Sequence, residues 1–92
     1  MKKRVIIIGA GEAGKMVSND ILRNKKISDK YEIIGFLDDD KTKDVINHIP
    51  VLGGLDAVGR ISEQYNVDEI IISIPSADKE LISSIIRKVS DL

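Results

Sequence analysis

The stretch RVIIIGAGEAGKMV, residues 4–17, places a glycine-rich turn directly after a run of β-branched residues. Gly9, Gly11 and Gly14 fit the pattern G-x-G-x-x-G, whose glycines allow a tight turn, the approach of a pyrophosphate to the backbone, and close packing of a helix on a strand. The same letters from Gly9 to Lys15 also fit the beginning of a P-loop, G-x-x-x-x-G-K. The two interpretations imply different ligands, and the rest of the chain decides between them.

The P-loop interpretation lacks its metal contacts. A P-loop needs a hydroxyl directly after the lysine, because that oxygen binds Mg²⁺, and Met16 occupies this position. The last predicted strand ends at Ile74 and Pro75 and offers no aspartate for a second magnesium contact. The dinucleotide pattern is therefore favoured, since its glycines follow a predicted strand and open a predicted helix, as that motif requires.

Apolar spacing predicts an alternation of strands and helices along the whole chain. The predicted strands are 5–8, 31–37, 51–52 and 69–74, and the predicted helices are 12–24, 56–66 and a last one through residues 81–89. Asp56 is the expected cap of the second helix, and Ser76 or Asp78 that of the third. Residues 24–30 are expected to form a loop, and the polar segment 38–48 predicts no regular element.

This alternation predicts an α/β fold with parallel strands and right-handed crossovers. We expect half of a doubly wound, Rossmann-like sheet in the order 3-2-1-4, within three α/β/α layers. The cleft should then lie at the carboxyl ends of the first and fourth strands, where the direction of winding reverses. Residues 1–92 are expected to form a single nucleotide-binding module, because no repeat or linker divides them.

The expected binding site combines the glycine turn with an acid at the end of the second strand. Free N–H groups at the start of the helix would face the phosphates, and Asp38 would accept hydrogen bonds from ribose hydroxyls. An acid there favours NAD or another adenosine ligand over NADP, and the nearby Lys41 and Lys43 keep that preference modest. Asp40 is expected to be a solvated turn residue. The predicted ligand contacts are Gly9, Ala10, Gly11, Glu12, Ala13, Gly14, Asp38, Asp39, Ile74, Pro75 and Ser76.

Two alternatives remain open for this site. The glycines could serve only a tight strand–helix junction in a fold that has lost its ligand. The carboxylate of Glu12 suits the helix dipole, but it would repel or exclude a pyrophosphate if it pointed inward.

Composition excludes several other functions. Among 92 residues there is no cysteine and one histidine, and the net charge is −1. Disulfides, thiolate metal sites and an electrostatic footprint for nucleic acid are therefore not expected. No apolar run approaches the roughly 20 residues of a membrane span. His48 is expected to be a loop residue without chemistry, and no nucleophile–base pair or carboxylate dyad can be assembled, so no catalytic residue is predicted.

Four motifs in order carry a resemblance to a known family: VIIIGAGEAGKMV, YEIIGFLDDD, IPVLGGLDAV and VDEIIISIPSA. The chain resembles, over about residues 4–89, the N-terminal nucleotide-binding module of bacterial nucleoside-diphosphate-sugar 4,6-dehydratases and epimerases of polysaccharide biosynthesis. That module is often described as a coenzyme-A-binding-like Rossmann domain.

The resemblance implies that catalysis lies elsewhere in a larger parent protein. In that family a covalently linked C-terminal domain acts on a UDP-sugar with bound NAD(P), through a Tyr-x-x-x-Lys pair. Here Tyr31 is followed at that spacing by Gly35, and Tyr65 by Glu69. The chain is therefore expected to be a fragment: a non-catalytic, regulatory or accessory module that binds NAD, coenzyme A or a UDP-sugar. Members commonly carry upstream membrane helices, which would place the basic residues 2–4 on the cytoplasmic side.

Two other identities are kept as alternatives. The chain is also similar to the N-terminal nucleotide-sugar-binding domain of sugar O-acyl- or N-acetyltransferases. That family favours Gly-His where this chain has Glu12-Ala13, and a Gly-Asp-Asn-like ending where it has residues 75–77, Pro-Ser-Ala. The second alternative is an assembly domain with a vestigial cleft, whose open sheet edges would favour a homo-oligomer.

Overall fold

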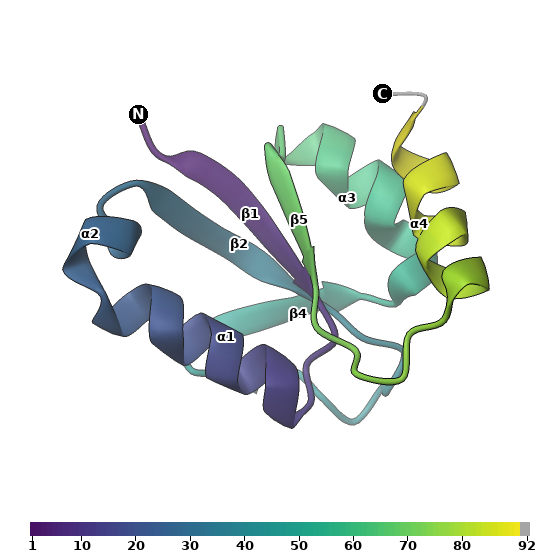
Figure 1. Cartoon of the computed structure of the whole chain (residues 1–92), viewed down its shortest axis with the longest axis horizontal. Coiled ribbons are helices and arrows are strands. Elements are labelled where there is room, and N and C mark those ends of the chain that lie inside the picture. Colours follow the sequence, from purple (N-terminus) through teal and green to yellow (C-terminus); the bar gives the residue numbers. More distant parts are fainter. Residues whose placement is uncertain (91–92) are drawn as a thin grey trace.

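A computed structural model describes residues 1–90, and its centre is a five-stranded sheet (Figure 1). The sheet order is β3-β4-β2-β1-β5, with parallel pairing between β1 and β2, β1 and β5, and β2 and β4. The predicted order 3-2-1-4 corresponds to β4-β2-β1-β5, and the α/β class is confirmed; an additional edge strand, β3, was not predicted. The strands are β1 (Lys3–Ile8), β2 (Tyr31–Leu37), β3 (Val45–Ile46), β4 (Ile49–Gly53) and β5 (Glu69–Ile72).

The central strand β1 is apolar without alternation because both of its faces are covered. All four side chains of residues 5–8 are fully buried. Val5 and Ile7 pack with Phe36 on one face of the sheet, and Ile6 and Ile8 belong to the core on the other face. The strand therefore holds both cores together, and its carboxyl end leads directly into the glycine turn.

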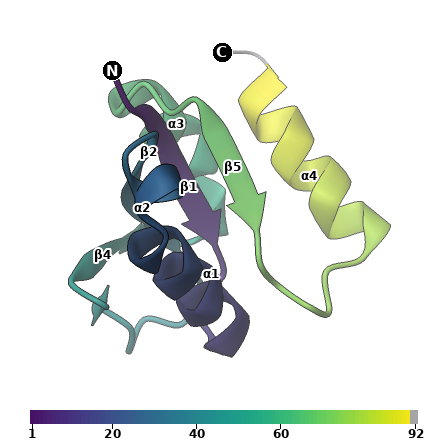
Figure 2. The same ribbon diagram turned by 60° about the vertical axis from the view of Figure 1, so that its left-hand side comes forward.

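Helices cover both faces of the sheet, which confirms the three-layer arrangement. Helices α1 and α2 lie on one side, and α3 and α4 on the other (Figures 1 and 2). No helix within residues 1–90 is long and apolar enough to cross a membrane. The helical elements are α1 (Glu12–Arg23), α2 (Lys25–Ser28), the 3₁₀ turn η1 (Leu55–Ala57), α3 (Val58–Gln64) and α4 (Lys79–Ser90).

Two connections differ from the sequence-based expectation. The predicted loop after α1 contains the short helix α2, because the side chain of Asn24 accepts hydrogen bonds from the N–H groups of Lys26 and Ile27 and so starts a new turn. The prediction that Asp56 caps the next helix was wrong. A 3₁₀ turn precedes α3, and the Asp56 carboxylate instead accepts a 2.8 Å hydrogen bond from Lys88 of α4.

The final helix, α4, begins at one of the two caps predicted for it, Asp78. Asp78 Oδ1 accepts a 2.9 Å hydrogen bond from the N–H of Leu81, which satisfies one of the donors that a helix start leaves free. Of its apolar residues, Ile85 is buried, whereas Ile82 and Ile86 are exposed. Helix α4 therefore uses only part of its apolar face in this packing.

The polar segment after β2 ends in a hairpin. Strands β3 and β4 pair antiparallel, with Ile46 opposite Ile49. The turn residues Asn47 and His48 have φ angles of 53° and 66°, and positive angles at both central positions define a type I′ turn. The Asn47 side chain donates hydrogen bonds to Ser18 Oγ and Asn19 Oδ1, so the hairpin is attached to α1.

Gly59 marks a close contact between α3 and α4. A Cβ atom at Gly59 would lie 2.7 Å from the carbonyl oxygen of Lys88. Replacing a helical glycine with alanine ordinarily raises the free energy of unfolding by about 1 kcal/mol. Here the added methyl group would instead force the two helices apart. We expect Gly59→Ala to lower the free energy of unfolding by about 1–2 kcal/mol in urea denaturation. The exposed Glu63→Ala on the same helix is the control, and a Gly59→Ala protein more stable than the wild type would contradict the packing.

Candidate functional site

Two glycines of the turn are required by the packing of the fold itself. Gly9 has a φ of 102°, and a Cβ there would lie 2.8 Å from the carbonyl oxygen of Ser73. A Cβ at Gly14 would collide with the carbonyl oxygen of Gly9, because α1 passes directly over the turn. These two residues therefore serve the tight turn and the helix–strand contact.

Gly11 has no such structural reason to be glycine. Its backbone angles, φ −83° and ψ −158°, suit any residue. Within 4 Å, a Cβ there would meet only Lys43 Nζ, at 3.8 Å. Gly11 also caps α1 without any side-chain hydrogen bond, so the first N–H groups of the helix keep their capacity to bind an anion. The open space at Gly11 is where a ligand could approach the backbone.

Asp38 joins the end of β2 to the glycine turn. Its Oδ2 accepts a 2.8 Å hydrogen bond from the N–H of Ala10 and lies 3.5 Å from Lys43 Nζ, while its Oδ1 accepts a 2.8 Å bond from the N–H of Asp40. Burial by itself raises the pKa of Asp38, but the two backbone hydrogen bonds and Lys43 outweigh it, so the pKa is lowered. The carboxylate is therefore held ionised beside the turn.

The next two acids organise the surrounding loop. Asp39 Oδ1 accepts a 2.9 Å hydrogen bond from the N–H of Leu55, which holds the turn after β4 against the end of β2. Asp40 is exposed, and its Oδ1 accepts hydrogen bonds from the N–H and the hydroxyl of Thr42; these bonds lower the pKa of Asp40. Asp39 lines the site through a fixed carboxylate, and Asp40 closes a surface turn.

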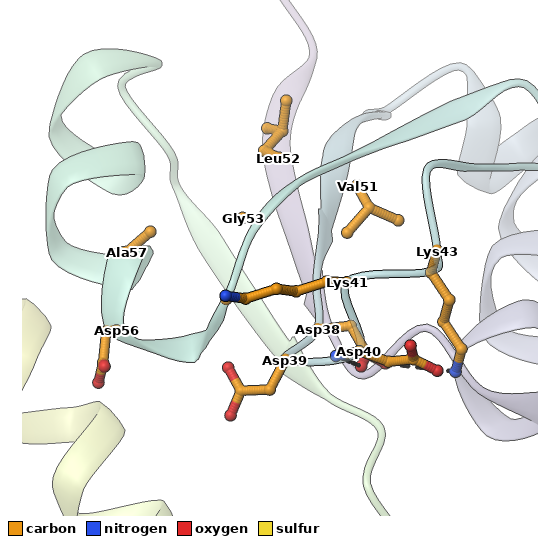
Figure 3. Close-up of a pocket in the computed structure, with 11 residues that line it drawn as sticks. Asp38, Asp39, Asp40, Lys41, Lys43, Val51, Leu52, Gly53, Asp56 and Ala57 are labelled. Atoms are coloured by element: carbon orange, nitrogen blue, oxygen red, sulfur yellow. Dashed lines mark hydrogen bonds and ion pairs between the residues drawn. The ribbon is translucent and has the colours of Figure 1, made fainter.

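Two pockets lie at this edge of the sheet. The larger, about 530 Å³, lies at the ends of β2 and β4, and Figure 3 shows the residues that line it. The smaller, about 370 Å³, lies between the glycine turn and the β3–β4 hairpin. Its lining residues are Ala10, Gly11, Glu12, Lys15, Lys43, Val45, Ile46 and Asn47.

Both pockets lie on the β2 side of β1, whereas the cleft was expected between β1 and β5. The hairpin and the acidic loop build walls on the β2 side. Ile74 packs against Gly9 instead, and neither Pro75 nor Ser76 lines either pocket. Glu12 is exposed at the rim of the smaller pocket and leaves its volume open.

The sequence predicted neither the hairpin nor a ligand contact for Lys43. Both lie in the segment where polar residues obscured any periodic pattern. One signal was present: Asn47-His48 stands between two short apolar pairs, and asparagine and histidine are among the residues that tolerate positive φ. A two-residue hairpin after β2 could have been predicted from this signal, and it would have placed Lys43 near the glycine turn.

A central parallel strand that ends in a glycine turn, with an acid at the end of its neighbour, defines a Rossmann-like domain of the nucleotide-binding class. Solved structures that share this fold include the following two. RSP, a Rex-family repressor, matches with a TM-score of 0.77 and 19% identity over 96% of this chain and 41% of that chain. UDP-D-quinovosamine 4-dehydrogenase from Vibrio fischeri matches with a TM-score of 0.75 and 26% identity over 97% of this chain and 73% of that chain.

The chain belongs to the CoA-binding domain family, which matches residues 1–92. It is 35% identical over 77 residues to the probable polysaccharide biosynthesis protein EpsC of Bacillus subtilis, and 24% identical over 87 residues to the capsular polysaccharide biosynthesis protein CapD of Staphylococcus aureus. These alignments cover 79% and 91% of this chain but only 12% and 14% of the two relatives. The resemblance inferred from the sequence is thereby confirmed.

Proposed function

We propose that this domain binds a nucleotide that carries a diphosphate, and that it performs no reaction by itself. The observation that carries the proposal is Gly11: the fold does not need glycine there, whereas a phosphate approaching the backbone does. Within the turn 9–14, the N–H groups of Gly9 and Ala10 are already bonded to Leu37 and Asp38, so the N–H groups of residues 11–14 would hold the diphosphate. Solved structures with the same fold support a nucleotide ligand. One is RSP in complex with β-NADH, and another is UDP-D-quinovosamine 4-dehydrogenase, whose name includes a UDP-sugar.

Asp38 would bind the ribose. A carboxylate offers about four acceptor sites, and three donors within the chain use it: two backbone N–H groups and Lys43. The larger pocket beside Asp38 and Asp39 has room for the nucleoside, with Val51 and Leu52 as its apolar lining. NAD, coenzyme A and UDP-sugars all present a ribose next to a diphosphate, and these are the ligands we propose. Ile74, Pro75 and Ser76 remain the predicted far wall.

The parent protein would be a nucleoside-diphosphate-sugar dehydratase or epimerase of cell-surface polysaccharide biosynthesis. The alignments span only 12% and 14% of the two polysaccharide biosynthesis relatives. The remaining length of those proteins supports a catalytic domain covalently linked to this one. In that setting the module would be regulatory or accessory and would face the cytoplasm.

Gly11→Ala tests the binding role. We expect the wild type to bind at least one of NAD⁺, coenzyme A, UDP and UDP-N-acetylglucosamine in isothermal titration calorimetry. The added methyl group displaces the phosphate from the helix N–H groups, so affinity should fall about tenfold or more, as the loss of one charge-assisted hydrogen bond predicts. The variant should remain folded, with less than about 1 kcal/mol lost, because alanine is only a poorer N-cap than glycine. If the wild type bound none of the four at millimolar concentration, the proposed function would be wrong.

A further inference from the structure

Lys43 occupies the junction of the two pockets. Among the residues that the structure describes, 1–90, it is the one side chain that lines both pockets. Its Nζ lies 3.5 Å from Asp38 Oδ2 and 3.8 Å from the position of a Cβ on Gly11. The ammonium group therefore lies between the carboxylate proposed for the ribose and the backbone proposed for the diphosphate.

The backbone around Lys43 is fixed on both sides. Its N–H donates a 3.1 Å hydrogen bond to the carbonyl oxygen of Asp40, which closes the acidic turn. On the other side, Asn47 attaches the hairpin to α1. The side chain itself keeps 30% of its surface exposed. A fixed backbone with a partly exposed lysine lets the ammonium group exchange partners over a short distance without a movement of the loop.

A diphosphate needs such a cation at this site. Five carboxylates line the two pockets and oppose a polyanion: those of Glu12, Asp38, Asp39, Asp40 and Asp56. Backbone N–H groups alone bring no net charge. Lys15 lines the small pocket and Lys41 the large one; Figure 3 shows Lys41 extending away from Lys43. The ammonium group closest to both Gly11 and Asp38 is that of Lys43.

We propose that Lys43 selects ligands that carry a diphosphate: its ammonium leaves Asp38 for the diphosphate, and Asp38 in turn accepts the ribose hydroxyls. This inference rests on the proposed nucleotide-binding function and adds to it the residue that sets the preference for diphosphate ligands. Without ligand, the Lys43–Asp38 pair satisfies both charges. With ligand, each group gains a partner of its own, so a nucleoside that lacks phosphate gains little from Lys43.

The experiment compares each nucleoside with its diphosphate. Uridine, UDP, adenosine, ADP and inorganic pyrophosphate are titrated into ¹⁵N-labelled wild type, Lys43→Gln, Lys43→Arg and a control, with affinity taken from amide shifts. The control is Lys30→Gln, because Lys30 is exposed and lines neither pocket. We expect the wild type to prefer a diphosphate over its nucleoside at least tenfold. Lys43→Gln should reduce that preference to less than threefold, whereas Lys43→Arg and Lys30→Gln should keep it. Dispersed amide spectra establish that each variant is folded.

The outcomes separate this inference from the proposed function. If Lys43→Gln keeps the tenfold preference, the role of Lys43 is overturned while nucleotide binding stands. The role of Lys43 is equally overturned if Lys30→Gln loses the preference as fully as Lys43→Gln, because the effect then comes from the net charge of the domain. If the wild type binds none of the five probes, the selection of diphosphates by Lys43 is overturned, and nucleotide binding is then decided by the calorimetric titrations. Loss of preference in Lys43→Gln with retention in Lys43→Arg supports the selection of diphosphates by this residue.

Discussion

Gly14→Ala should lower the free energy of unfolding by about 3 kcal/mol or more, the upper end of what an added group in a packed region costs. The methyl group would collide with the carbonyl oxygen of Gly9, and neither group can move away without moving the backbone. The Gly9 carbonyl belongs to the backbone of a tight turn, where φ of Gly9 is 102°, and Gly14 lies in the first turn of a twelve-residue helix. Relief requires α1 to move off the sheet, which uncovers the core under Val17. Urea denaturation followed by far-ultraviolet circular dichroism measures the loss.

Gly11→Ala is the matched control for this prediction, because both changes add one methyl group to a glycine of the same turn. At position 11 the methyl group enters open space, so the loss should stay below about 1 kcal/mol. Stability should thus depend on Gly14, and ligand affinity on Gly11. A Gly14→Ala protein that lost less than about 1 kcal/mol would contradict the close passage of the helix over the turn.

This division between the glycines also shows what the sequence could predict. The spacing of the motif implied a role for each glycine, and the packing now supplies the physical reason for Gly9 and Gly14. The central strand and the order β4-β2-β1-β5 followed from continuous apolar runs and the rules for parallel crossovers. Such features depend on local periodicity and chain connectivity, which are present in the sequence itself.

The pocket walls depend on tertiary contacts that cannot be inferred from the spacing of residues in the sequence. The ion pair of Lys43 with Asp38 and the hydrogen bonds from Asn47 to α1 join residues through tertiary structure. A polar segment carries no periodic signal, and only position in the chain separated the three consecutive aspartates: Asp38 at the strand end as the ribose candidate, and Asp40 as a solvated turn residue. Their hydrogen bonds distinguish them: one faces the glycine turn, one holds the turn after β4, and one caps a surface turn.

Asp38→Ala should have the second largest effect on stability, about 3 kcal/mol at pH 7. The side chain is 18% exposed and accepts two backbone hydrogen bonds. Its removal leaves the N–H groups of Ala10 and Asp40 without these acceptors and Lys43 without its counterion. A hydrogen bond to a charged group contributes about 1.5–3 kcal/mol, and partial access of water to the unpaired N–H groups limits the total.

The pH dependence of this loss has a definite sign. The folded-state pKa of Asp38 lies below its unfolded value, which is near 3.9. The ionised carboxylate therefore stabilises the fold fully above the unfolded pKa, and this stabilisation is lost as the pH falls through the lower, folded pKa. Urea denaturation of wild type and Asp38→Ala should show a constant difference between pH 7 and 5, which narrows below about pH 4. Two results would show that Asp38 does not hold the turn and Lys43 together. One is a difference in unfolding free energy between wild type and Asp38→Ala that widens on acidification. The other is a difference below about 0.5 kcal/mol at pH 7.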